Sequence, residues 1–296
     1  MPEITTITDP TGYAWVLDGS YGVWEGRGRA GFHGTSYQHY RTDSPAVAGS
    51  FWNGVRALSK ELLVPIVIRD PNRDVALAKR RQFAQSISPV NGDGLCTITS
   101  AWPDGSVRSI DCRYIDGLEA GAQGPGEYGI TTFKYNIRFM ADDPYFYGPA
   151  IAASYSLATS SRTELPIPGT DTFYEVVTSP FIGGGITVFN AGDVAAYPTW
   201  QFNGPYTQIV AQNATTGKTW TITYTAATNS DLLVVSTSPA NTYIIDEFGI
   251  NQWSSLTAGN QLWPLARGTN IININVIGAD ATSTATLSYV PLYEGD

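Results

Sequence analysis

The chain is dominated by short segments in which apolar and polar residues alternate, separated by Gly, Pro, Asn and Asp residues. Alternation with a period of two is typical of a half-buried β-strand, because successive side chains on a strand point to opposite faces. Such segments follow one another from residue 185 to residue 293 at about the spacing of the strands in a β-sandwich. The sequence therefore predicts a mainly β fold.

One segment, residues 70–87 (DPNRDVALAKRRQFAQSI), has a helical pattern instead. Three apolar residues recur at helical spacing and predict a buried stripe: Ala76, Phe83 and Ile87. Asp74 is the expected N-cap, Arg80 and Arg81 are expected on the outer surface, and Pro89 is expected to end the helix. The sequence thus predicts a single helix within a β protein.

Residues 95–115 (LCTITSAWPDGSVRSIDCRYI) have the pattern of a β-hairpin that turns at residues 103–105. A loop of these three residues would place Cys96 directly opposite Cys112. A disulfide between them is one interpretation. Directly opposed strand positions rarely carry a disulfide, and the N-terminus, MPEITTITDP, lacks a secretory signal. Two reduced, buried thiols are the favoured interpretation.

Charge is distributed unevenly along the chain. Residues 1–147 contain 14 Lys and Arg against 16 Asp and Glu, whereas residues 148–296 contain 3 against 10. This shift predicts two modules, 1–147 and 148–296, and the net charge of −9 argues against nucleic-acid binding. No stretch approaches the roughly 18 apolar residues of a membrane span, so we expect a protein made in the cytoplasm without membrane insertion.

The predicted border lies at residues 139–148 (FMADDPYFYG), which offer the strongest candidate for catalytic carboxylates. A retaining glycosidase needs two carboxyl groups about 5 Å apart, but neighbouring residues on an extended chain point to opposite faces. Asp-Pro also favours a turn. The favoured interpretation is therefore an interdomain junction formed by Asp142, Asp143, Pro144, Tyr145, Phe146, Tyr147 and Gly148.

Other signals of chemistry are weak. His33 and His39 would share a face if they lay on one strand, yet no further Cys or His lies nearby to complete a zinc site. Residues 26–34 (GRGRAGFHG) lack the Lys-Ser/Thr of a phosphate-binding loop, and no nucleophile motif is evident. We therefore expect no enzymatic activity, no cofactor and no metal.

Four tryptophans of the second module, Trp200, Trp220, Trp253 and Trp263, have two interpretations. Exposed aromatic rings on a β-sandwich could stack on sugars and so provide glycan contacts. Aromatic residues in such folds are more commonly part of the core, which is the favoured interpretation.

Four segments together resemble the distal tail protein family of tailed bacteriophages, also described as minor tail proteins: residues 86–119, 139–148, 190–220 and 262–276. Residues 86–119 contain the end of the helix and a hairpin with the motif PDGSVR. The other three segments contain the motifs FMADDPYFYG, NAGDVAAYPTW and LWPLARGTN, in that order. The resemblance covers nearly the whole chain and is poorest in the first seventy residues. Phe146 stands where a tryptophan is more usual.

This resemblance implies an N-terminal β-barrel or split β-sandwich with one helix, followed by a galectin-like β-sandwich. It also implies a homo-oligomeric, six-fold ring in the virion. The ring would lie at the distal end of a siphovirus-type tail and join the tail tube protein to tail-tip or baseplate proteins. The alternative function is a carbohydrate-binding module that attaches to a host glycan through its second module.

Overall fold

A computed structural model describes residues 3–46, 48–118, 131–156, 163–166, 173–176, 186–280 and 282–296. The chain divides into two compact units. The first comprises Met1–Pro149 together with Tyr293–Asp296, and the second comprises Ala150–Leu292. The sequence placed the border after residue 147 and assigned the last four residues to the second module.

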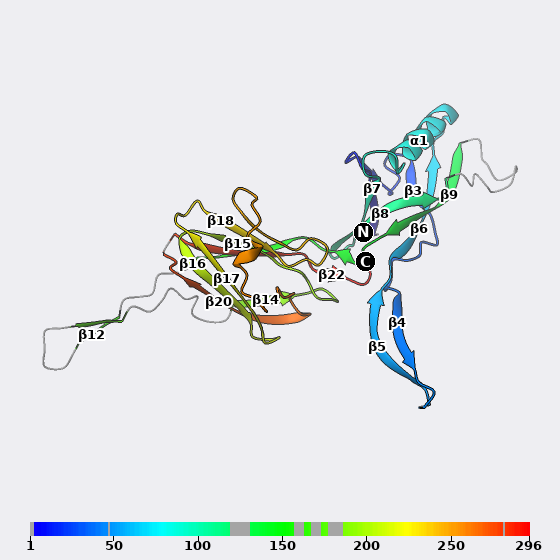
Figure 1. The fold of residues 1–296 in the computed structure, drawn as a ribbon. Helices are drawn as coiled ribbons and strands as arrows, with labels where there is room; N and C mark the ends of the chain where they lie inside the picture. Colours follow the sequence, from blue (N-terminus) through cyan, green and yellow to red (C-terminus); the bar gives the residue numbers. More distant parts are fainter. Residues whose placement is uncertain are drawn as a thin grey trace. The chain divides into compact units, whose positions relative to one another are not determined.

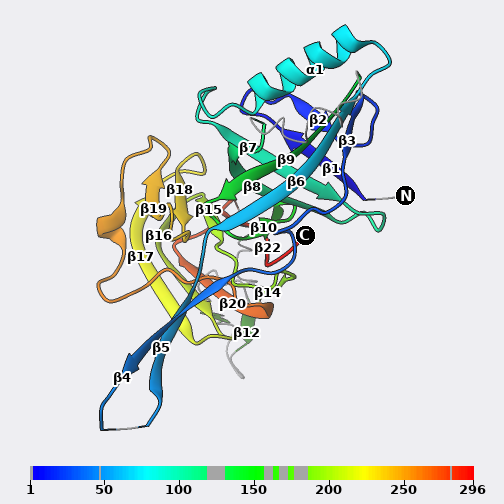
Figure 2. The same cartoon turned by 90° about the vertical axis from the view of Figure 1, so that its right-hand side faces the viewer.

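The first unit is built on seven antiparallel strands that form a nearly closed barrel (Figures 1 and 2). Their order in the sheet is β2 (Ala14–Val16), β1 (Ile4–Thr8), β7 (Leu95–Ala101), β8 (Val107–Asp116), β9 (Thr132–Ala141), β6 (Lys60–Arg69) and β3 (Val23–Glu25). The first and last strands of this order meet through a bridge between Asp18 and Trp24 and a hydrogen bond from Glu25 N to Leu17 O. The family resemblance allowed either a barrel or a split sandwich for this unit, and the structure shows a barrel.

Strand β6 forms one wall of the barrel and pairs with β9 over its whole length. Its apolar run, LLVPIVI, buries alternate residues in the core of the unit, as expected for a strand with little contact with water. The hairpin of β7 and β8 has the predicted register, with Cys96 opposite Cys112 and the turn closed by a hydrogen bond from Trp102 N to Ser106 O. Both cysteines are buried free thiols, which confirms the favoured interpretation.

The predicted helix is α1 (Arg73–Ser86), and it buries Ala76 and Phe83. Its N-cap is Asn72, whose side chain accepts a hydrogen bond from the backbone N of Asp74, so the expectation that Asp74 is the cap was wrong. Asp74 lies in the first turn, where a carboxylate interacts favourably with the helix dipole.

The two arginines of the helix also differ from each other. Arg81 is exposed as expected, but Arg80 is half-buried. The guanidinium of Arg80 lies 5.5 Å from the centre of the Phe133 ring and 5.9 Å from that of Tyr135. Its placement on the outer surface was therefore wrong, because these aromatic rings of β9 provide a cation–π contact.

Strands β4 (Tyr37–Asp43) and β5 (Ser50–Ala57) form a separate two-stranded hairpin of the first unit. In Figures 1 and 2 it projects away from the barrel strands of that unit. A β-bulge interrupts the register between Tyr40 and Arg41, where Tyr40 pairs with Gly54 and Arg41 with Trp52.

The second unit is a β-sandwich of two antiparallel sheets. One sheet has the order β11 (Ile151–Ser156), β21 (Thr284–Tyr289), β15 (Thr199–Asn203), β18 (Leu232–Ser236) and β19 (Tyr243–Asp246). The other has the order β14 (Ile186–Asn190), β20 (Gly268–Ile277), β16 (Tyr206–Asn213) and β17 (Lys218–Ala226). Residues of both sheets share one core, so the predicted mainly β fold is confirmed.

The remaining elements are short. They are β10 (Phe146–Tyr147), β12 (Thr163–Pro166), β13 (Phe173–Val176), the 3₁₀ turn η1 (Trp253–Ser255) and β22 (Leu292–Tyr293). Strand β10 pairs with β8 and β22, and β12 pairs with β13. Within the described ranges, no helix has the length and apolar character needed to span a bilayer.

Candidate functional site

The β4–β5 hairpin carries large apolar side chains on both of its faces. The register places Trp52 and Val55 on one face, and Phe51 and Tyr40 on the other. Trp52 is 62% exposed and Phe51 is 53% exposed, although aromatic side chains of this size normally seek burial. Among the described strands, β4 and β5 pair only with each other. An isolated two-stranded sheet is only marginally stable in water, so this hairpin is a candidate interaction surface.

The hairpin also carries positive charge. Arg41 and Arg56 are exposed, and neither forms an ion pair with any residue in the described part of the chain. His39 lies on β4, where its Nδ1 accepts a hydrogen bond from Trp52 Nε1 at 3.4 Å. Exposed aromatic rings beside guanidinium groups are the residue types that dominate protein–protein interfaces.

The base of the hairpin is held by the last residues of the chain. Glu294 accepts two hydrogen bonds at its backbone O, from Lys60 Nζ at 2.7 Å and from Thr35 Oγ1 at 3.2 Å. The hydroxyl of Tyr37, the first residue of β4, donates to the Glu294 carboxylate. This hydrogen bond, together with burial, raises the pKa of Tyr37. The orientation of the hairpin root is thus coupled to residues 293–296.

The same four residues are fixed to the barrel itself. The guanidinium of Arg108 lies 4.0 Å from the centre of the Tyr293 ring and donates to Gly295 O at 2.7 Å. The carboxylate of Asp296 is fully buried, 2.8 Å from Arg29 Nη2, and accepts a hydrogen bond from Ser100 Oγ at 3.0 Å. These contacts make residues 293–296 part of the first unit.

The predicted junction residues have structural roles in the first unit. Asp142 forms an exposed ion pair with Arg113 at 2.7 Å, while Asp143 accepts a hydrogen bond from Tyr145 N at 3.1 Å. The two carboxylates therefore serve separate interactions.

The rest of the junction is anchored in the barrel. Phe146 is fully buried, and its ring lies 6.0 Å from that of Phe32. Tyr147 donates a hydrogen bond to Asp111 at 2.9 Å. Gly148 is buried, and a Cβ there would lie tightly against the Tyr293 ring, at 3.2 Å; Pro144 is also buried. The segment enters the barrel core before the chain leaves for the second unit.

Three of the four candidate glycan contacts lie in the core of the second unit. Trp200, Trp220 and Trp263 are fully buried, with ring centres 6.1 to 6.4 Å apart. They have no surface to offer a sugar, so the glycan alternative does not hold for these three and the favoured core interpretation does. Trp253, in η1, is 45% exposed and is the one of the four that a ligand could reach.

The two histidines do not lie on one strand. His33 lies in the loop before β4, with its Nδ1 3.4 Å from the Asp296 carboxylate, whereas His39 lies within β4. Across the residues that the structure describes, no three His, Cys, Asp or Glu side chains form a group that could hold a metal ion. Burial raises the pKa of the Cys96 thiol to about 11, so this thiol is protonated at neutral pH.

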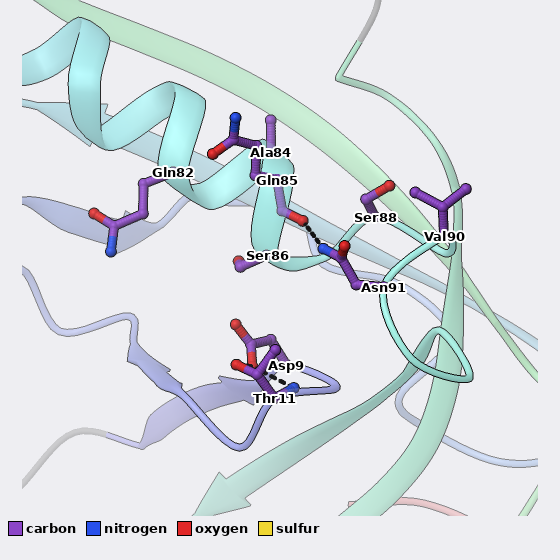
Figure 3. Close-up of a pocket in the computed structure, with 9 residues that line it drawn as sticks. All are labelled: Asp9, Thr11, Gln82, Ala84, Gln85, Ser86, Ser88, Val90 and Asn91. Atoms are coloured by element: carbon purple, nitrogen blue, oxygen red, sulfur yellow. Dashed lines mark hydrogen bonds between the residues drawn. The ribbon is translucent and has the colours of Figure 1, made fainter.

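A groove that no sequence motif indicates lies between the β1–β2 turn and the C-terminal end of α1 (Figure 3). It is open to solvent, has a volume of about 700 Å³, and is lined by Asp9, Thr11, Gln82, Ala84, Gln85, Ser86, Ser88, Val90 and Asn91. Asp9 is its one charged lining residue, and its Oδ1 accepts hydrogen bonds from Thr11 N, Thr11 Oγ1 and Tyr13 N. The carboxylate therefore holds the turn and has no basic residue beside it in the lining.

The whole fold is similar to solved structures of phage tail proteins. The crystal structure of the phage SPP1 Dit protein (gp 19.1) matches with a TM-score of 0.66 and 16% identity, over 97% of this chain and 98% of that chain. That protein is described as a paradigm of the hub of the adsorption apparatus in phages that infect Gram-positive hosts. A chain of the phage P2 baseplate in its activated conformation with Ca matches with a TM-score of 0.51 and 9% identity, over 97% and 98%.

No protein-family model and no curated protein matches the sequence. At identities this low the similarity concerns the fold, and function has to be inferred from surfaces. The chain therefore has the fold of the SPP1 Dit hub protein and of a phage P2 baseplate protein, which confirms at the level of fold the resemblance that its sequence motifs predicted.

Proposed function

We propose that this protein is a structural component of a phage tail, a distal tail protein that assembles into a ring. The ring joins the tail tube protein to tail-tip or baseplate proteins at the distal end of the virion, after synthesis and assembly in the host cytoplasm. A hexamer is the proposed stoichiometry. The subunit has no catalytic role in this proposal.

The observation that carries the proposal is the β4–β5 hairpin. It exposes aromatic side chains on both faces, so a contact with its own barrel on one face would still leave the other face uncovered. A neighbouring copy in a ring provides a second surface, because the same heterologous contact repeats between neighbouring subunits around the rotation axis until the ring is closed. The similarity to a hub protein and a baseplate protein supports the same conclusion.

The test is the solution mass of the full chain and of hairpin variants, measured by light scattering. Six copies of the 31.9 kDa chain have a mass of about 190 kDa. Trp52→Ser and Phe51→Ser remove exposed aromatic anchors, and losing such an anchor weakens an interface about tenfold or more. We expect these variants to shift the mass towards the monomer at concentrations at which the unmodified ring persists.

Phe189→Ser is the matched control, because Phe189 is 61% exposed but lies on β14 of the second unit. It should leave the mass unchanged. A monomer for the unmodified chain at every concentration, including after addition of tail tubes, would contradict the ring. The alternative function, a carbohydrate-binding module, now depends on Trp253, since its three companions are buried.

A further inference from the structure

The loop between β19 and η1 is the most apolar exposed segment among the described residues of the second unit. We call residues 247–253 the Trp253 loop. Three large side chains project from it: Phe248 is 79% exposed, Ile250 is 58% exposed and Trp253 is 45% exposed. Figure 2 shows this segment in orange, beyond β19 at the margin of the sandwich. Clusters of this kind on a soluble domain mark interaction sites more often than isolated apolar residues do.

The loop is held in place by hydrogen bonds to a buried carboxylate. Asp246 accepts from Phe248 N at 3.0 Å, from Ile250 N at 2.8 Å and from Gln252 Nε2 at 2.9 Å. Burial acts to raise the pKa of Asp246, but the hydrogen bonds from Ile250, Gln252 and Phe248 outweigh it and lower the pKa. Asp246 is therefore ionised at neutral pH.

Two further contacts fix the end of the loop. Asn251 Oδ1 accepts a hydrogen bond from Trp253 N at 2.8 Å, and Asn251 forms a β-bridge with Ile245. The apolar side chains are thus presented by an ordered backbone, which lowers the entropy lost when a partner binds.

The surroundings of the loop are acidic. Glu247 is exposed and Asp231 is half-buried, and Glu247 Oε2 accepts a hydrogen bond from Leu232 N at 3.4 Å. Burial raises the pKa of Tyr224, and the charges of Glu247, Asp246 and Asp231 raise it further. Among the described residues, none of the three forms an ion pair.

The chemistry of the loop favours one class of partner. Phe248 and Ile250 offer no hydrogen-bonding side-chain group, whereas a sugar requires hydrogen bonds as well as an aromatic face. A guanidinium group could stack on Trp253 while remaining close to Glu247, and adjacent apolar side chains could cover Phe248. The described part of the second unit has two cations of its own, Lys218 and Arg267, and the latter lies 4.0 Å from Asp193.

We propose that the Trp253 loop is a docking site for a basic, apolar segment of another protein, in which Arg or Lys residues alternate with aliphatic or aromatic residues. This inference rests on the proposed function, because a tail hub must bind a further tail component. It assigns that contact to the second unit, whereas the ring contact is assigned to the hairpin of the first.

The experiment uses the full chain and a short synthetic peptide of alternating Arg and Leu, with a Glu and Leu peptide as its counterpart. Calorimetry gives the Kd of each peptide for the unmodified chain and for Phe248→Ser, Trp253→Ala, Glu247→Lys and the control Phe189→Ser. We expect the Arg peptide to bind about tenfold or more weakly to the Phe248 and Trp253 variants, as at an interface anchor. The control should keep the original Kd.

The Glu247→Lys variant tests the role of charge separately. It should weaken binding of the Arg peptide and strengthen binding of the Glu peptide, since charge complementarity determines which partner is accepted. If the variant bound both peptides equally more weakly, the substitution would have disrupted the loop in general, and the proposal would be overturned.

Three other results would also overturn it. These are an absence of Arg-peptide binding, binding that Phe248→Ser and Trp253→Ala leave unchanged, and binding of glucose, galactose or N-acetylglucosamine oligosaccharides that Trp253→Ala abolishes. A fall in the oligomer mass of Phe248→Ser would assign the loop to a second copy of this chain and likewise refute the proposal. The ring is tested separately, because only the hairpin variants should change the mass.

Discussion

At the scale of single residues, Lys60 has an unusual environment in the first unit. Its side chain is buried, with Nζ 4.8 Å from the centre of the Phe146 ring and 2.7 Å from Glu294 O. Burial lowers its pKa to about 8, although the Asp296 and Glu294 carboxylates partly oppose this shift. A lysine that is partly neutral just above neutral pH is held in place mainly by packing and by the carbonyl of Glu294.

This shift predicts a dependence of stability on pH. Between the folded pKa of about 8 and the ordinary value of 10.5, the unfolded chain binds a proton at Lys60 that the folded chain does not bind. Stability should therefore rise with pH across this window. In Lys60→Met this contribution should disappear, so the difference in free energy of unfolding between the two proteins should change across the window. Urea titrations measure this difference.

Lys134→Met is the control for this prediction, because Lys134 is exposed on β9. Its free energy of unfolding should remain parallel to that of the unmodified protein as the pH rises. Parallel curves for Lys60→Met as well would show that Lys60 does not titrate in this range.

At the scale of elements, α1 shows how a local signal can be ambiguous. Asn72 and Asp74 are both favoured N-cap residues and lie two positions apart, so composition alone did not identify the cap. The structure resolves this through the hydrogen bond from Asp74 N to Asn72 Oδ1 at 2.9 Å.

The cap assignment predicts different costs for two neighbouring substitutions. Asn72→Ala should lower the free energy of unfolding by about 1 kcal/mol, the usual cost of removing an N-cap side chain. Asp74→Ala should cost less, about 0.3–1 kcal/mol, because it removes only a favourable charge near the helix dipole. Chemical denaturation of both variants tests the order, and the reverse order would contradict the assignment of Asn72 as the cap.

The sequence predicted best those elements in which periodicity and turn chemistry agree. A three-residue turn at residues 103–105 is enough by itself to place Cys96 opposite Cys112, and the hairpin has this register. The pairing of β4 with β5 was not predicted from the sequence, because aromatic residues on both faces remove the alternation that a buried face imposes. Likewise, no local pattern distinguishes the exposed Trp253 from the buried Trp263, since burial depends on the partner sheet.

At the scale of the whole molecule, each unit has its own core, and the chain passes from the first unit to the second and back. Tyr293–Asp296 join the first unit through Arg108, Lys60 and Arg29, which are distant from them in the sequence. Composition could indicate two modules but not this return, because the contacts span between 187 and 267 residues.

Removing residues 293–296 should therefore destabilise the unit that begins the chain. Lys60, Arg29 and Arg108 would lose hydrogen-bond partners, and each partly buried partner left unpaired costs about 1–3 kcal/mol. The second unit, with its core around Trp200, Trp220 and Trp263, should keep its transition. Calorimetry of the full and the shortened chain measures the two unfolding transitions. An equal loss of stability in both unfolding transitions would contradict the division into two units.

The return of residues 293–296 has a consequence for synthesis on the ribosome. The barrel and the base of its hairpin are completed only when the last four residues emerge, after the entire second unit has been translated. On a nascent chain, the hydrogen bond from Tyr37 to Glu294 at the hairpin root therefore forms late. In the proposed ring, translation of the second unit would therefore precede completion of the hairpin root that a neighbouring subunit contacts.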